Sequence, residues 1–375
     1  MTRYVHYVGS LPRELMTGFG DQMTWFVDHS QGHPLTGVPC DLDADWIIDY
    51  LRERERHADV LEVVRGGDFS DYSDMRSYGI RRGAKLEPRH VSMDRVDRIR
   101  EVVAAYRQLQ AAHPELKDTK IQISQPLPID LALFVFAGAA VTDGLPIGRA
   151  VRHLDVVMTA LRQLPVFVEA MLEEIRQLHQ EHGDILKWQV ETPIAQLGMV
   201  KAAQLGAQGP AASLLSRQLG SFLARVHEIG AETVIHLCYG NYRKKELLSP
   251  RDLSPAVNLL NPTGRMLRRQ GVPLPALHIP CAYGASPSPL EESFYRPLRR
   301  LDPEWKLIAG VVSETSEEGS ARSLALFEEA SGRTAHGVAT TCGLGRCTVE
   351  DAEKAAAATV ATADAPGGEE EAGAA

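Results

Sequence analysis

Short apolar runs alternate with longer amphipathic stretches from about residue 1 to about residue 350. The runs are brief and mostly apolar, which is typical of parallel strands that are covered on both faces. Eight segments fit this description: Tyr4–Val8, Val60–Val64, Thr119–Ile123, Trp188–Val190, Thr233–His236, Ala276–Ile279, Leu307–Val312 and Gly337–Thr340.

Helical patterns lie between these runs, with apolar residues recurring at spacings of three and four, as in Met93–Ala112, Val166–Glu181 and Pro210–Ile229. Alternation of helices with eight strands predicts an α/β fold, a (β/α)8 TIM barrel formed by residues 1–355 as a single domain. A doubly wound open sheet is the competing architecture. The absence of a GxGxxG turn after any strand disfavours it.

Two segments depart from the alternation. Residues 18–43 are longer than a barrel turn requires, and we interpret them as an insertion. Such an insertion could be a lid, an interface loop that mediates a homodimer, or a packed surface excursion. Residues 356–375 consist mainly of Ala, Gly and Glu and predict a disordered acidic tail. Ala355–Ala358 could finish a helix, and disorder is expected from Asp364 onward.

Composition narrows the class of protein. Of the 375 residues, 44% are hydrophobic and 24% are charged, with a formal net charge of −9, which indicates neither a nucleic-acid surface nor a polybasic membrane patch. The N-terminus contains no apolar run of signal-peptide length, and the most apolar stretch, Ile129–Val141, is shorter than the ~20 residues of a spanning helix. We therefore expect a soluble, cytoplasmic protein. Its five cysteines are free to bind metal or to be buried, because an odd number without a secretion signal argues against disulfides.

The first motif with chemical content is His236-Leu237-Cys238-Tyr239-Gly240-Asn241, at the end of an apolar run. Residues two apart on a strand point the same way, so the imidazole of His236 and the thiol of Cys238 share one side. At the C-terminal end of a barrel strand, that side faces the mouth where active sites lie.

The second motif is Cys342-Gly343-Leu344-Gly345-Arg346, where another apolar run breaks into a glycine-rich turn. Together the two motifs offer one nitrogen and two sulfurs from His236, Cys238 and Cys342. Three protein ligands with one open position are typical of a catalytic zinc ion, and thiolates favour zinc over magnesium or calcium.

With these motifs in order, the chain resembles the catalytic domain of cobalamin-independent methionine synthases, within the uroporphyrinogen-decarboxylase-like barrels. The family typically has a His-x-Cys strand end and a later Cys-Gly-Leu turn. Three further segments are similar to family segments and stand in the same order: Tyr7–Arg13, Gly67–Met75 and Gln189–Pro193. The likeness covers roughly residues 4 to 355.

This resemblance implies a Zn²⁺ enzyme of methionine-biosynthesis type that transfers a methyl or other alkyl group to a small, homocysteine-like thiol. Zinc lowers the pKa of the thiol, so that a sulfur nucleophile exists at neutral pH. On the family pattern, Ser10 helps hold the carboxylate of the thiol substrate, and Glu191 holds its ammonium group. The alternative for Glu191 is a salt bridge within the protein.

The chain departs from the family in two respects. Pro280 falls near the position of a further zinc ligand, a Glu, so that zinc has three protein ligands or is also bound by Cys281, His278 or Glu314, of which Cys281 is nearest. The chain also has room for one barrel only, which disfavours methyltetrahydrofolate as the donor. Single-barrel relatives are similar to enzymes that take methyl from a corrinoid, or that open epoxides with a thiol such as coenzyme M.

Several other side chains have two interpretations each. Tyr239 or His278 could donate a proton if an epoxide is opened, although His278 on an apolar strand is also typical of a core histidine. Trp188 and Tyr239 could line a substrate pocket or fill the core. Asp74 could contact the alkyl donor or belong to a polar loop.

Two rival functions remain from the sequence. One is a metal-free decarboxylase of the uroporphyrinogen type, which shares the fold. The other is a barrel that binds metal or thiol without turnover.

Overall fold

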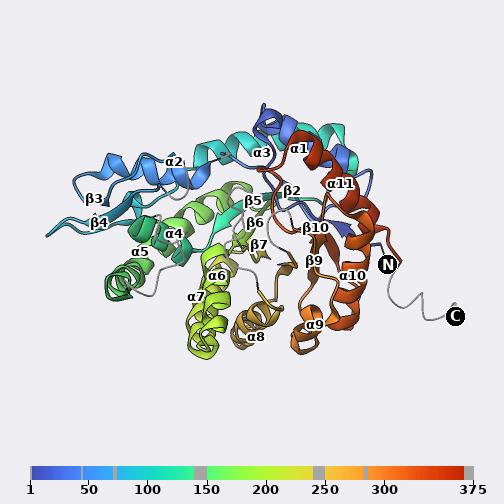
Figure 1. Ribbon diagram of the computed structural model, residues 1–375. Coiled ribbons are helices and arrows are strands. Elements are labelled where there is room, and N and C mark those ends of the chain that lie inside the picture. The colour runs from blue at the N-terminus through green and yellow to red at the C-terminus, as the bar shows by residue number, and fades with distance from the viewer. Residues whose placement is uncertain are drawn as a thin grey trace.

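The computed structural model describes residues 2–43, 45–70, 74–138, 150–239, 250–282 and 286–366. Its centre is a sheet of eight parallel strands in the order β1-β10-β9-β8-β7-β6-β5-β2 (Figure 1). The strands are β1 Tyr4–Val5, β2 Val38–Pro39, β5 Ile121–Pro126, β6 Leu186–Glu191, β7 Glu232–His236, β8 Ala276–Pro280, β9 Leu307–Val312 and β10 Gly337–Thr340. The α/β class with a parallel sheet, expected from the alternation along the sequence, is confirmed.

The sheet is curled, so that its two edge strands approach each other. Val5 of β1 forms a parallel bridge with Leu35, three residues before β2. The Val5 amide donates to the Pro34 carbonyl at 2.9 Å, and the Thr36 amide donates to the Val5 carbonyl at 3.1 Å. The two edge strands, β1 and β2, are thus connected by a short bridge at Leu35 and not by a full ladder of hydrogen bonds.

Helices cover the outer side of the curled sheet (Figure 1). The described residues form the helices α1 Phe19–His29, α2 Trp46–Glu53, α3 Val96–Ala112, α4 Pro128–Ala137, α5 Ala150–His182, α6 Pro193–Gln204, α7 Gln208–Glu228, α8 Ser254–Arg269, α9 Glu292–Tyr295, α10 Glu317–Ser331 and α11 Val349–Ala363. Of these, α2 lies apart from the outer layer, beside the hairpin of Leu61–Arg65 and Ser77–Ile80 (Figure 1). Their ends follow local rules: Ser316 accepts a hydrogen bond from the Gly319 amide at the start of α10, and Gly332 takes a left-handed conformation at its end. Within the described residues, no helix combines the length and the apolar character needed to span a bilayer.

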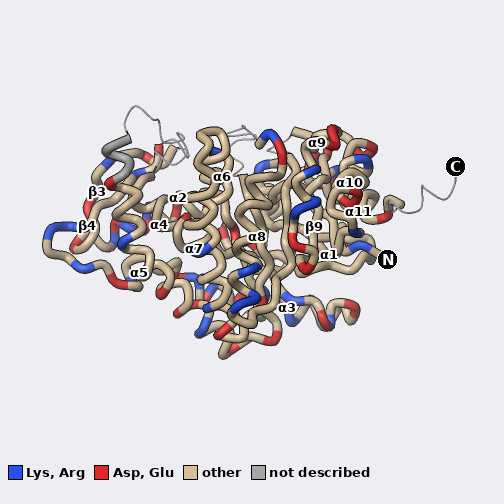
Figure 2. Tube along the Cα trace, turned by 90° about the horizontal axis from the view of Figure 1, so that it is seen from below, with Lys and Arg blue, Asp and Glu red and all other residues tan. Residues whose placement is uncertain are grey.

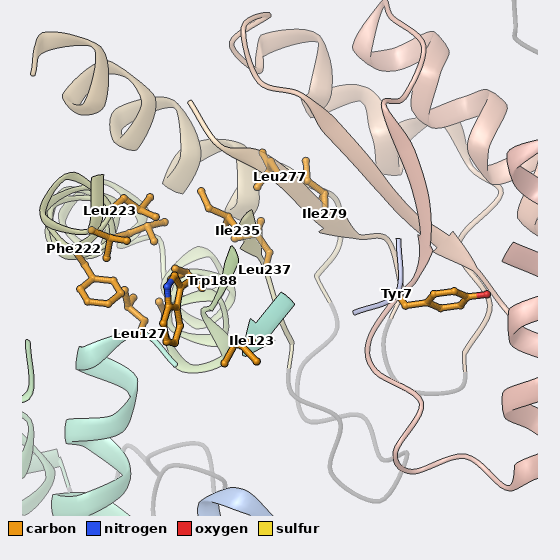
Figure 3. Close-up of a cluster of buried hydrophobic side chains, with 14 of the residues drawn as sticks. Tyr7, Ile123, Leu127, Trp188, Phe222, Leu223, Ile235, Leu237, Leu277 and Ile279 are labelled. Carbon is orange, nitrogen blue, oxygen red and sulfur yellow. The ribbon is translucent and has the colours of Figure 1, made fainter. Parts of the chain in front are cut away.

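The main core lies between the sheet and the helices. Figure 3 shows Trp188 of β6 in one buried cluster with Leu127 and with Phe222 and Leu223 of α7. Trp188 is only 1% exposed. Burying each such side chain contributes about 1.5–3 kcal/mol, which fixes the outward-facing residues of the strands against the helices.

One expected strand is wrong, and its replacement comes from the segment expected to be an insertion. Leu61–Arg65 forms β3, which pairs antiparallel with β4 (Ser77–Ile80) in a separate hairpin. Val63 and Val64 are 48% and 69% exposed, unlike residues of a covered parallel strand. Residues 18–43 instead supply α1 and β2, and β2 pairs in parallel with β5.

The C-terminal boundary also moves. The expected tail from residue 356 begins inside α11, which continues to Ala363 and buries Ala356, Ala358 and Val360. The alanines of α11 pack closely here because their small side chains allow the helix to approach the sheet. Residues 367–375 lie outside the described part of the chain.

Charged residues are distributed over the helices rather than gathered by sign. Figure 2 shows Lys and Arg interspersed with Asp and Glu on the face that it presents. Many pair locally, as Arg100 does with Asp97 at 2.6 Å. Exposed pairs of this kind contribute little to stability, typically about 0–1 kcal/mol.

Candidate metal centre

One imidazole and two thiols that could bind a metal ion meet at the carboxyl ends of two strands. His236 is the last residue of β7, Cys238 follows two residues later, and Cys342 lies two residues beyond the end of β10. Their ligand atoms all lie within 4.8 Å of one another, and the two Sγ atoms are 3.9 Å apart. Two sulfurs bound about 2.3 Å from a tetrahedral zinc ion are about 3.8 Å apart, so these residues fit such an ion.

The electrostatics of the cluster favour a thiolate. A hydrogen bond from the Cys238 thiol, followed by the interactions with His236 and Arg346, lowers the pKa of Cys342 well below its usual value although burial opposes this. Burial alone raises the pKa of the Cys281 thiol above its usual range. The cluster is thus set apart chemically as well as spatially, because only a thiolate binds zinc well.

His236 is held by a second histidine. The Nδ1 atoms of His236 and His278 are 2.6 Å apart, and Nε2 of His278 lies 3.0 Å from the carbonyl oxygen of Thr340. His278 is fully buried, and this burial, together with the neighbouring His236, lowers its pKa well below 6.5. His278 is therefore a neutral imidazole that connects β8 to both ligand-bearing strands.

The turn after Cys342 packs directly onto the loop after β1. The Leu344 amide lies 3.2 Å from the Gly9 carbonyl, and the Gly345 amide donates to Ser10 Oγ at 3.1 Å. A Cβ atom on Gly343 would lie 2.3 Å from Ser10 Oγ and 2.4 Å from the Gly9 carbonyl oxygen. Gly343 and Gly345 are therefore required for this close approach, which brings Ser10 beside Cys342.

A cavity of about 710 Å³ opens above the cluster. Its wall includes the three ligands together with Ser10, Asp41, Ser124, Glu191 and Arg346. Of the residues expected from the sequence to touch substrate, Ser10 and Glu191 therefore line the same cavity as His236, Cys238 and Cys342.

Two of the carboxyl groups in the cavity wall, those of Asp41 and Glu191, lie close enough to influence each other's charge. Burial, and then the negative charge of Glu191, raise the pKa of Asp41 to about 7, although hydrogen bonds from Ser10 and Ser124 oppose the shift. Burial also raises the pKa of Glu191, while the nearby His236 lowers it. Gln189 donates a hydrogen bond to Glu191 Oε1 at 3.1 Å and so orients it.

Asp130 stabilises the start of α6, the helix that follows Glu191. Asp130 Oδ2 accepts a hydrogen bond from the Ile194 amide at 2.9 Å, which caps the helix that follows Glu191. Asp130 is completely buried, and that burial raises its pKa to about 8.

Sequence reasoning missed Asp41, Ser124 and Asp130. Asp41 lies just beyond β2, a strand of two residues that contains Pro39 and therefore has almost no periodic signal. The sequence does contain one sign of this site, because Asp41 directly follows the short apolar run 38–40 within residues 18–43.

Cys281, expected as a further ligand, lies outside the cluster. His236 and His278 are register partners, so on β8 the residues in step with His278 share its side, and Cys281 is out of step. It packs in the outer core with Leu277 and Ile279, and its thiol lies 3.7 Å from the Ile279 carbonyl oxygen. Glu314 likewise does not belong to the cluster.

Four other expected site residues do not line the cavity. Trp188 is out of step with Glu191 on β6 and packs among the helices. Tyr239 is 3% exposed and accepts a hydrogen bond from Gln196 at 3.3 Å. Asp74 accepts from the Asp68 and Ser70 amides and so closes its own loop. The fourth residue, His278, contacts His236 and the Thr340 carbonyl instead of the cavity. Gly240 and Asn241, which complete the first motif, lie outside the described residues.

Two solved structures similar to this chain carry the names of methyl-transferring enzymes. One is a B12-independent methionine synthase from Shewanella sp. W3-18-1 in complex with selenomethionine, with a TM-score of 0.49, 14% identity and 97% of each chain covered. The other is a methyltransferase from Methanosarcina mazei, with a TM-score of 0.48, 13% identity and coverage of 97% of this chain and 93% of that one. No protein-family model and no curated protein matches the chain. The first structure is named as a member of the family that the sequence motifs resemble.

Proposed function

We propose that this protein is a zinc enzyme that transfers an alkyl group, most simply methyl, to a small thiol. The observation that carries this proposal is the convergence of His236, Cys238 and Cys342 within 4.8 Å of one another on the wall of a cavity. We include in the proposal a single domain in which the curled sheet closes as a (β/α)8 barrel, as the Val5–Leu35 bridge supports.

The donor set selects zinc. Two sulfurs and one imidazole nitrogen suit zinc and not the oxygen-seeking magnesium or calcium. Among the described residues no carboxylate joins the three ligands, so a fourth position is left for a substrate. A zinc ion would lower the pKa of a substrate thiol bound at this fourth position, so that a sulfur nucleophile exists at neutral pH.

The chain's own residues bind and orient the thiol. Asp41 and Glu191 offer negative charge to a cationic group such as an ammonium, and the Ser10 region offers polar contacts beside Cys342. In the reaction the thiol sulfur loses its proton to solvent and forms a bond to the alkyl carbon. The bond from that carbon to the donor breaks, and the donor leaves with the electron pair.

The cavity has room for both reactants. Its volume of about 710 Å³ falls within the roughly 300–1,000 Å³ of pockets that bury drug-sized ligands. Apolar side chains of Trp46, Met93 and Phe134 form part of the wall and could contact the alkyl donor.

A second candidate, the opening of an epoxide by the thiol, is supported by Asp41. This reaction forms an alkoxide that needs a proton, and a carboxyl with a pKa of about 7 on the cavity wall can donate one. Tyr239 and His278, the donors expected from the sequence, do not line the cavity. Asp41→Asn therefore separates the two chemistries: it should abolish epoxide opening but leave methyl transfer to a neutral thiol.

Metal content is the direct test of the site. Plasma mass spectrometry of the purified protein should find one zinc per chain, lost in Cys238→Ala and Cys342→Ala. Cys281→Ala is the matched control, because it removes a buried thiol outside the cluster, and it should retain zinc. A wild-type protein without zinc after supplementation would overturn the proposal.

Turnover is tested by offering pairs of substrates. Homocysteine, cysteine and coenzyme M are each combined with methylcobalamin, methyltetrahydrofolate or an epoxide, and the alkylated thiol is detected by mass spectrometry. A product that requires zinc and Cys238 supports the transferase. Zinc binding with no product from any pair would instead favour a binding protein.

A further inference from the structure

We propose that His278 is a positioning residue that fixes the tautomer of His236, so that His236 presents an unprotonated Nε2 to the metal. This inference rests on the proposed metal site and deepens it. It assigns to β8 a role other than the supply of a ligand.

The direction of the hydrogen bonds begins at Thr340. A backbone carbonyl oxygen can only accept, so the contact of 3.0 Å to the Thr340 oxygen places the proton of His278 on Nε2. A neutral imidazole carries one N–H, and Nδ1 of His278 is then an acceptor.

The contact between His278 and His236 then determines which nitrogen of His236 carries the proton. The Nδ1 atoms of His278 and His236 are 2.6 Å apart, a distance that requires a proton between them. Since Nδ1 of His278 is an acceptor, Nδ1 of His236 is the donor. The lone pair of His236 Nε2 is then the one left for a metal, as in histidine ligands whose other N–H is held by a neighbouring acceptor.

The two hydrogen bonds, from His236 to His278 and from His278 to the Thr340 carbonyl, are called the relay below, and the fold leaves space for them. Gly310 on β9 is the register partner of Pro280, and a Cβ atom there would lie 2.5 Å from Nε2 of His278. Any side chain at residue 310 would therefore displace the ring. His278 itself is 0% exposed, so bulk solvent does not compete for its two nitrogens.

The relay also connects two of the three ligands mechanically. Thr340, the acceptor for His278, uses its own hydroxyl to donate to the Cys342 carbonyl at 2.7 Å. One chain of contacts thus runs from β7 through β8 to β10, and it fixes the direction of the His236 ring relative to Cys342.

Two substitutions of similar size test the relay. His278→Asn places an amide oxygen at the level of Nδ1 and keeps an acceptor for His236, whereas His278→Gln places its amide at the level of Nε2 and leaves the His236 N–H unpaired. Zinc dissociation constants are measured by competition with a chromophoric chelator. We expect His278→Gln to bind zinc roughly 10- to 100-fold more weakly and His278→Asn to stay near wild type. Cys281→Ala, on the same strand end but outside the relay, should also match wild type.

Nitrogen-15 NMR of histidine-labelled wild-type protein reads the tautomer without any substitution. We expect His236 to carry its proton on Nδ1 both without and with zinc. A proton on Nε2, or equal zinc affinity in folded His278→Gln and wild type, would overturn the inference. If the wild type binds no zinc at all, the proposed function fails, but the tautomer in the metal-free protein still decides the role of His278.

Discussion

Asp41 and Glu191 place two carboxyl groups on the wall of one cavity, both within hydrogen-bonding reach of the Ser124 hydroxyl. They come from the ends of two strands that are separated in the sheet by β5. Because like charges in a buried site disfavour each other's ionised form, the pair carries its second negative charge only near neutral pH. This relationship makes the charge of the cavity adjustable around physiological pH.

The affinity for a cationic thiol should therefore depend on pH. A carboxyl is charged above its pKa, so Asp41, with a pKa of about 7, gains its charge as the pH rises through about 7. We expect an amino thiol to bind more tightly at about pH 8 than at about pH 6, and Asp41→Asn to flatten this dependence. Isothermal titration calorimetry across this range measures it. The same slope in Asp41→Asn would assign the dependence to another group.

Glu191→Gln should weaken the binding of an amino thiol at least roughly tenfold. A hydrogen bond to a charged group contributes about 1.5–3 kcal/mol, and the amide keeps the shape but loses the charge. The same variant should bind a thiol without an ammonium group as the wild type does. Dissociation constants for the two thiols provide the comparison, and equal losses for both would show that Glu191 acts on the shape of the site instead.

Gly343→Ala should damage both stability and metal binding. The added Cβ would lie 2.3 Å from Ser10 Oγ and 2.4 Å from a backbone oxygen, so the turn that carries Cys342 has to move. Crowding of this kind costs about 1–3 kcal/mol. Urea unfolding and zinc content are the measurements. Gly209→Ala is the control, since nothing lies within 4 Å of its added Cβ and alanine suits a helix.

Asp130 should make the protein less stable as the pH rises. Its pKa is raised from 3.8 to about 8 in the folded state, so the folded chain holds a proton that the unfolded chain releases between these values. Stability relative to Asp130→Asn should thus fall from about pH 4 to about pH 8 and level off above. Urea unfolding of both proteins at several pH values tests this, and parallel curves would contradict it.

Trp188 should matter for folding and not for the site. Trp188→Ala removes a side chain that is 1% exposed and should cost about 3–5 kcal/mol. Zinc content and thiol affinity of the folded fraction should be unchanged, because Trp188 faces the helices. A selective loss of thiol affinity would restore the expectation that it contacts substrate.

Much of the architecture was readable from the sequence because it depends on local periodicity. Seven of the eight expected strands lie in the sheet, and helices such as α3 and α7 start within a few residues of their expected positions. His236, Cys238 and Cys342 were readable for the same reason: each lies where an apolar run ends in a turn, and in a parallel sheet such ends gather on one side. Side chains alternate between the two faces of a strand. Once the register with His236 is known, this alternation excludes Cys281 and Trp188 from the face that carries the metal site.

Register itself, however, was decided only by the tertiary structure. The two-residue strand β2 gains its place from pairing with β5 and not from its own pattern, so the sequence by itself favoured Val60–Val64, which forms a hairpin instead. Asp41 reaches the cavity through that pairing, and His278 reaches His236 because β7 and β8 are neighbours in register. Contacts between residues tens of positions apart depend on how whole strands align, and short-range spacing along the chain contains no information about that alignment.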